Sequence, residues 1–103
     1  MQQENRDLCK FALFLPEDFE DYEWEVVAKG YFSGARLEIQ GGICLLNFYD
    51  ATRLDQELRD EIRRSVIFFE SNLVIVRSVT RASMTSAVQE LADSGKINFL
   101  RRE

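Results

Sequence analysis

The stretch Trp24–Tyr49 reads WEVVAKGYF-SG-ARLEIQ-GG-ICLLNFY, and its pattern decides the fold that we predict for the chain. Three runs of alternating apolar residues are separated by two pairs of small residues, Ser33-Gly34 and Gly41-Gly42. Two-residue hairpin loops favour such pairs because the primed turns require positive φ. The pattern therefore predicts a three-strand antiparallel meander over residues 24–49.

Period-2 alternation assigns the side chains of this meander to two faces. With two-residue loops, Leu37 pairs with Leu46 and Ala35 with Phe48. The predicted core face carries no charge and consists of Trp24, Val26, Ala28, Gly30, Phe32, Ala35, Leu37, Ile39, Cys44, Leu46 and Phe48. The opposite face mixes apolar and charged residues and is more apolar than a purely solvated face needs.

Two segments after the meander predict amphipathic helices, at about 53–64 and about 82–92. Their apolar stripes consist of Leu54, Leu58 and Ile62 in the first helix and of Met84, Ala87, Val88 and Leu91 in the second. Thr52 and Thr80 precede the two stripes and are the predicted N-caps. A helix of this kind normally buries its apolar stripe. We therefore expect both helices to pack on the core face of the sheet.

Further strands are predicted from dense apolar runs at 8–15 and 73–76, with a short last strand at 97–100. Residues 66–69 fit either a short strand or an apolar anchor segment. The acidic run Glu17–Glu25 is predicted to be a solvated linker or a single helical turn, held down by Phe19 and Tyr22, rather than a cation site, because it lacks the glycine of a Ca²⁺ loop. This order of elements predicts an α+β two-layer sandwich with a mixed, mostly antiparallel sheet.

Composition bounds the class of protein. The 103 residues predict a single domain over 1–103, with polar residues 1–7 expected to be disordered. The net charge of -5 argues against a general affinity for nucleic acid or anionic membranes. Two distant cysteines, Cys9 and Cys44, are interpreted as free thiols, and the absence of histidine removes the commonest metal ligand and general base. We expect a cytoplasmic protein without cofactor or metal.

The two predicted helix starts are a candidate ligand-binding site. Helix N-termini attract anions through unpaired N–H groups and partial positive charge. If the preceding strands are neighbours and run in the same direction, both starts meet at one edge of the sheet. The candidate anion-binding residues are Thr52, Arg53, Thr80, Arg81 and Ser83. The alternative is that the threonines only cap the helices and the arginines are solvated.

The second candidate is the mixed face of the sheet, which neither predicted helix covers. Its apolar members, the candidate interaction surface, are Val27, Tyr31, Ile43, Leu45 and Tyr49. Exposed apolar patches often mark contacts with a partner or between identical subunits. The alternative is that segment 8–15 or 66–69 folds over this face.

No catalytic motif accompanies these features, and an enzyme is the less favoured class. The first hypothesis is a non-enzymatic protein-interaction or self-associating module, a homo-oligomer or the binder of a protein partner, that acts through the open sheet face. The second is an anion-binding or enzymatic domain with its site at the two helix starts.

Overall fold

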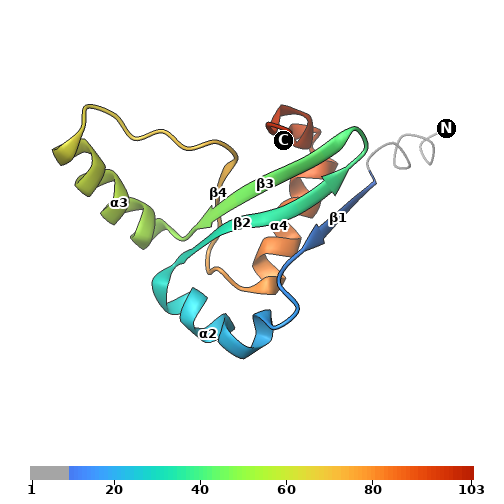
Figure 1. Cartoon of the computed structure of the whole chain (residues 1–103), viewed down its shortest axis with the longest axis horizontal. Coiled ribbons are helices and arrows are strands. Elements are labelled where there is room, and N and C mark those ends of the chain that lie inside the picture. Colours follow the sequence, from blue (N-terminus) through green and yellow to red (C-terminus); the bar gives the residue numbers. More distant parts are fainter. Residues whose placement is uncertain (1–9) are drawn as a thin grey trace.

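The computed structural model describes residues 10–103. The expected disorder of residues 1–7, the start of the predicted first strand at Leu8 and the thiol of Cys9 lie outside the described residues. Figure 1 shows the arrangement of the helices and strands. In chain order they are β1 (Phe11–Phe14), α2 (Phe19–Lys29), β2 (Tyr31–Ile39), β3 (Gly42–Tyr49), α3 (Ala51–Arg64), β4 (Leu73–Ile75), α4 (Arg81–Asp93) and the 3₁₀ helix η1 (Lys96–Phe99).

The four strands form one mixed sheet in the order β1-β2-β3-β4. The first three are antiparallel, with Leu13 opposite Leu37 in the β1–β2 pair. β4 runs parallel to β3, with Phe48 opposite Val74. The predicted α+β two-layer class is confirmed, and β4 is an edge strand of the sheet.

The first strand of the predicted meander is wrong, because residues 24–29 belong to helix α2. Phe19 and Val26 are buried and Tyr22 is half-buried, a spacing that places all three on one side of a helix. Trp24, predicted to lie in the core, is 70% exposed. The acidic run is likewise the start of this helix and not a linker. β1 takes the place of the missing strand beside β2 (Figure 1).

The hairpin between β2 and β3 has a different register from the predicted one, but its side chains lie on the predicted faces of the sheet. Its loop is Gln40-Gly41 instead of Gly41-Gly42, so Ile39 pairs with Gly42. This pairing is shifted by two residues from the predicted one. Since side chains alternate with a period of two, a two-residue shift keeps each side chain on its predicted face.

Ser33-Gly34 does not form a turn but a bulge within β2. The register shifts between Ser33 and Ala35, and Gly34 adopts a φ of 77°. A bulge inserts one unpaired residue, so the alternation of side chains between the two faces of the sheet shifts by one residue. The predicted two-residue turn would have had the same effect. Phe32 and Ala35 consequently share the inner face, as predicted.

The inner face of the β2–β3 hairpin and helix α4 form the hydrophobic core. The core side chains of the hairpin and of α4 are Ala35, Leu37, Cys44, Leu46, Phe48, Met84, Val88 and Ala92. Phe19 and Val26 of α2, Val76 and Val79 between β4 and α4, and Ile97 of η1 complete it. Helix α4 thus packs where the sequence predicts, and Cys44 is a buried free thiol.

Helix α3 differs from expectation, because none of its residues is buried. Figure 1 shows it projecting away from the sheet, with the following residues returning to β4. The physical reason is that α4 already covers the inner face. Residues 66–69, predicted to be either a short strand or an apolar anchor segment, form neither strand nor helix.

The predicted strand at 97–100 is wrong, since Lys96–Phe99 forms a 3₁₀ helix. The residues beyond it follow the first half of β3. The Glu103 N–H donates to the Ile43 carbonyl at 2.7 Å, and Asn72 Nδ2 donates to the carbonyls of Leu45 at 3.1 Å and Arg101 at 2.9 Å. Asn72 therefore fastens the C-terminal segment to the sheet.

Gly30 joins α2 to the start of α3. Its φ of 71° ends α2, and its carbonyl accepts a hydrogen bond from the Asp50 N–H at 2.9 Å. A Cβ at this position would lie 2.6 Å from the Asp50 carboxyl carbon. Only glycine fits here without strain or overlap.

We predict that Gly30→Ala lowers the free energy of unfolding by about 2 kcal/mol or more, from left-handed strain plus overlap with Asp50. Gly34→Ala is the matched control, since Gly34 has a similar φ of 77° but open space around its Cβ position. It should cost only about 1 kcal/mol. Denaturant unfolding of both variants measures the difference, and equal losses would contradict the role assigned to Asp50.

Candidate functional site

The parallel pairing of β3 and β4 meets the condition set for an anion site. The chain leaves both strands at the same edge of the sheet and then enters α3 and α4. The two helices take different directions, however: α3 projects outward, and α4 lies across the inner face (Figure 1). Each helix start is consequently surrounded by its own set of side chains.

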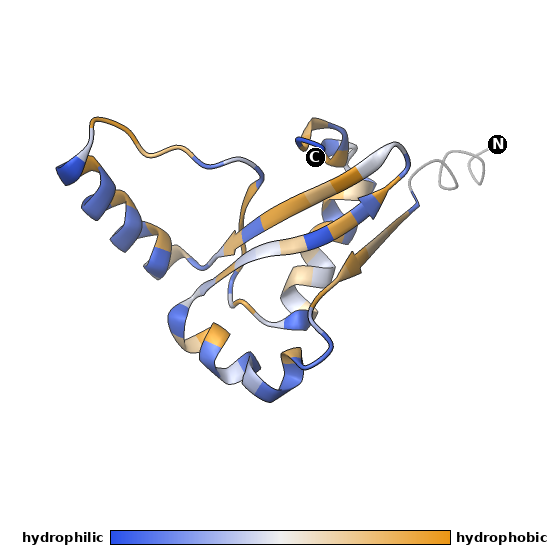
Figure 2. Ribbon diagram, in the orientation of Figure 1, coloured by the Kyte–Doolittle hydropathy of each residue, from blue (hydrophilic) through white to orange (hydrophobic). Residues whose placement is uncertain are grey.

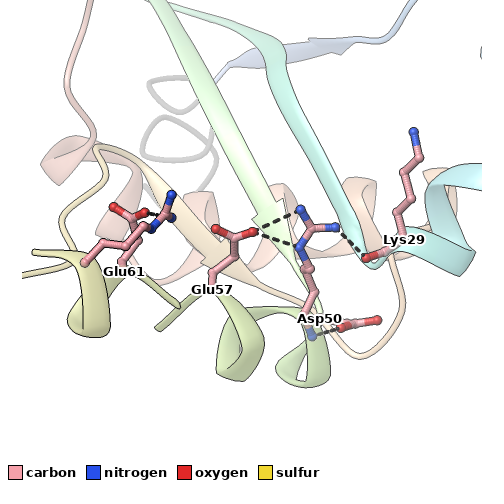
Figure 3. A network of polar contacts seen from close by, with 6 residues as sticks. Lys29, Asp50, Glu57 and Glu61 are labelled. Atoms are coloured by element: carbon pink, nitrogen blue, oxygen red, sulfur yellow. Dashed lines mark hydrogen bonds and ion pairs between the residues drawn. The ribbon is translucent and has the colours of Figure 1, made fainter. Parts of the chain in front are cut away.

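At the start of α3, Asp50 is the cap, not Thr52 as predicted. Asp50 Oδ1 accepts a hydrogen bond from the Arg53 N–H at 2.8 Å, and Thr52 is exposed. The Arg53 side chain lies along the helix, toward Glu57 in the next turn. It pairs with Glu57 at 3.0 Å and donates to the Lys29 carbonyl at 3.3 Å, as Figure 3 shows. Its charge is therefore balanced by a carboxylate of the same helix.

At the start of α4, Thr80 caps the helix as predicted, with Oγ1 accepting from the Ser83 N–H at 3.0 Å. Glu23 of α2 supplies a second acceptor, because its Oε2 receives the Arg81 N–H at 2.8 Å. The Arg81 guanidinium pairs with Glu20. The hydrogen bond from Arg81 also holds the pKa of Glu20 below its usual value.

The anion-attracting features of both helix starts are thus used within the chain. The sequence places Arg53 and Arg81 at helix starts, as observed, but it does not reveal that Glu57, Glu20 and Glu23 lie beside them. For α4, the signal was the acidic run in α2, interpreted instead as a solvated linker. These contacts fasten α2 to α4 and hold α3 in its direction.

The outer face of the sheet carries an aromatic cluster next to the start of α3. The Tyr31 and Tyr49 rings lie 4.7 Å apart between centroids, and Phe68 meets Tyr49 edge-on at 6.5 Å. The Arg53 guanidinium lies 5.2 Å from the centre of the Tyr31 ring. Burial, followed by the nearby Glu70 carboxylate, raises the pKa of Tyr49.

The predicted interaction surface is therefore divided. Tyr49 is only 3% exposed, Tyr31 is half-buried beneath Arg53, and Val27 lies on α2 instead of on the sheet. Leu45 is 38% exposed and Ile43 is half-buried beside the C-terminal segment. Phe68, in the segment named as an alternative cover, does lie against this face at Tyr49.

The largest gathering of exposed apolar side chains lies elsewhere, on residues 51–70, which we call the α3 arm. Figure 2 shows apolar residues on α3 and along the chain that follows it. The exposed members are Leu58, Ile62, Val66, Ile67 and Phe69, with Leu54 half-buried at the base. Val66 and Phe69 are 89% and 82% exposed. The sequence identified this apolar stripe but predicted it to be buried.

The orientation of α3 is unusual for an amphipathic helix. Among its charged residues, the half-buried ones are Arg53, Glu57 and Glu61. Glu57 pairs with Arg53 and Glu61 with Arg64 (Figure 3). The apolar stripe lies next to this row on the helix surface and is exposed at Leu58 and Ile62. A shallow hollow on the exposed side is lined by Leu58, Arg59, Ile62 and Arg63. The arm thus presents to solvent the side that an amphipathic helix normally buries.

No group of acidic, cysteine or histidine side chains within residues 10–103 is arranged to hold a metal ion. In the same part of the chain, no helix combines the length and apolar composition needed to cross a bilayer. Comparisons of the chain with protein families, with curated proteins and with solved structures give no match. The function is therefore argued from the geometry of the chain itself.

We predict that Glu23→Ala destabilises the protein by about 1 kcal/mol, because the α4 start loses its charged acceptor. The matched control is Glu25→Ala, an exposed acidic residue of the same helix, which should change stability by less than about 0.5 kcal/mol. Thermal or urea unfolding at neutral pH measures both. Equal effects would mean that the Glu23 contact contributes nothing.

The buried phenol of Tyr49 predicts an alkaline loss of stability. Its raised pKa means that the folded state holds the phenolic proton more tightly than the unfolded state does. This contribution is complete below the ordinary tyrosine pKa of 10.0 and decreases as the pH rises above it. Tyr49→Phe should therefore lose less stability than the wild type above about pH 10. Parallel slopes in urea unfolding at increasing pH would contradict this.

Proposed function

We propose that the protein is a non-enzymatic interaction module that associates with a second copy of itself through the α3 arm. The observation that carries this proposal is the exposure of the apolar stripe of α3 at Leu58 and Ile62, while only the base of the helix, at Arg53, contacts Tyr31 of the sheet and the Lys29 carbonyl. An apolar stripe that is exposed to solvent adds little to the stability of a single chain. It stabilises a complex when the surface of another molecule covers it.

Charge supports a second copy as the partner. Helix α3 contains four basic and four acidic residues, so it is neutral, and the whole net charge of -5 falls on the rest of the chain. Three ion pairs within the helix, Arg53–Glu57, Arg59–Asp55 and Arg64–Glu61, balance most of these charges. Two copies repel each other less through this helix than through an average part of their surfaces.

The proposed class of function is the one expected from the sequence, but the proposed contact surface is the α3 arm instead of the sheet face. The sheet face was the expected contact, but its two tyrosines are covered by Arg53 and Phe68. The anion-binding alternative loses support, because both arginines already pair with carboxylates of the chain. The α3 arm has more exposed apolar side chains than the outer face of the sheet.

We expect sedimentation equilibrium to give a mass that rises from monomer toward dimer as the wild-type concentration increases. Leu58→Glu places a charge in the middle of the stripe and should weaken association about tenfold or more. It should leave the unfolding free energy of the monomer almost unchanged, since Leu58 is 37% exposed.

The matched control is Trp24→Glu, which adds the same charge at a 70% exposed apolar residue of α2. It should associate like the wild type. A wild type that stays monomeric up to millimolar concentration, or equal effects of the two variants, would contradict the proposed function.

A further inference from the structure

We infer that two copies of α3 pair antiparallel about a two-fold axis that passes next to Leu58. This inference rests on the proposed self-association and specifies its geometry. A two-fold contact uses the same surface on both subunits, so the surface must be complementary to itself. Three features of the α3 arm meet that requirement for an antiparallel pair, and the second and third favour it over a parallel one.

The apolar stripe is the first feature, because it is symmetric about its middle. Leu54 and Ile62 lie four residues before and after Leu58. In an antiparallel pair centred on Leu58, Leu54 of one copy meets Ile62 of the other, and the two Leu58 side chains meet each other. The central contact is therefore apolar along its length.

The charges beside the stripe are the second feature. In an antiparallel helix pair, each flank of one helix meets the same flank of the other. The exposed flank carries Asp55 and Arg59, which lie 3.0 Å apart in an ion pair within one copy. Rotation about an axis near Leu58 brings Asp55 of one copy toward Arg59 of the other, twice. The opposite flank carries the half-buried Glu57 and Glu61, which already pair with Arg53 and Arg64 of the same helix.

The exposed apolar residue at the tip of the arm is the third feature. Val66 lies just beyond the far end of α3 and is 89% exposed. At 1.5 Å per residue, the 14-residue helix spans about 21 Å. An antiparallel partner brings Val66 to the start of the other α3, at Asp50, whereas a parallel partner leaves it at the outer tip. Beyond Val66 the chain returns to its own sheet, where Phe68 contacts Tyr49.

The hollow on α3 fits such a helix partner. It lies between the ridge that contains Leu58 and Ile62 and the ridge that contains Arg59 and Arg63. Ridges of residues four apart fill grooves of this kind when two helices pack. The Leu54–Leu58–Ile62 ridge of the second copy has this spacing.

Site-specific disulfide cross-linking tests the geometry in the full chain carrying Cys9→Ser, with the buried Cys44 kept. Leu58→Cys should give a covalent dimer under mild oxidation, because the two-fold axis brings its two sulfurs together. An equal mixture of Leu54→Cys and Ile62→Cys chains should cross-link more than either chain alone. Trp24→Cys, at an exposed position far along the sequence, sets the background of random collision.

Cross-linking of Leu58→Cys above that background, together with the preference for the mixture, supports the antiparallel pair. Background cross-linking of Leu58→Cys, or Leu54→Cys that cross-links alone as well as in the mixture, overturns it. Failure here remains distinguishable from failure of the proposed function. In the first case sedimentation still finds a dimer that Leu58→Glu weakens, and in the second the wild type sediments as a monomer.

Discussion

Burial of the inner face of the β2–β3 hairpin beneath α4 is the interaction on which the rest of the structure depends. Leu37, Leu46 and Phe48 are fully buried there against Met84 and Val88. Side chains of α4, α2 and η1 share this core, and none comes from α3. α2 closes one end of the core through Phe19 and Val26, and α3 finds its place outside it. The exposure of the α3 stripe is therefore a consequence of how the core is filled.

Which predictions succeeded follows from how local their physical cause is. The facing of β2 and β3 was correct although the loop and the bulge were misplaced, because alternation tolerates a two-residue shift and a bulge changes it by the same step as a turn. The two predicted helix N-caps, Thr52 and Thr80, also differ in outcome. Thr80 has the side chain and position of a cap, whereas Asp50, two residues before the predicted cap Thr52, takes that role in α3.

The helix over 19–29 was missed although its signals are present. Buried Phe19 and Val26 with half-buried Tyr22 follow helical spacing, and Gly30 ends the helix in a left-handed conformation. The same residues also contain a short alternating run, and the nearby Ser33-Gly34 pair favoured a hairpin. Short apolar runs fit both periods, and the choice was made by the sheet, where β1 pairs with β2. At the candidate site, the sequence located both arginines, but the carboxylates beside Arg81 come from 58 and 61 residues away.

The sequence by itself determined which faces are apolar: the inner side of β2 and β3, the stripe of α4 and the stripe of α3. These follow from the spacing of side chains along a strand or a helix, which is a property of the local chain. Only the tertiary structure decided which of these faces cover one another. The hydrophobic effect is non-directional and rewards any cover, so the pairing depends on the space that the whole chain leaves. That space admits α4 and leaves the stripe of α3 exposed.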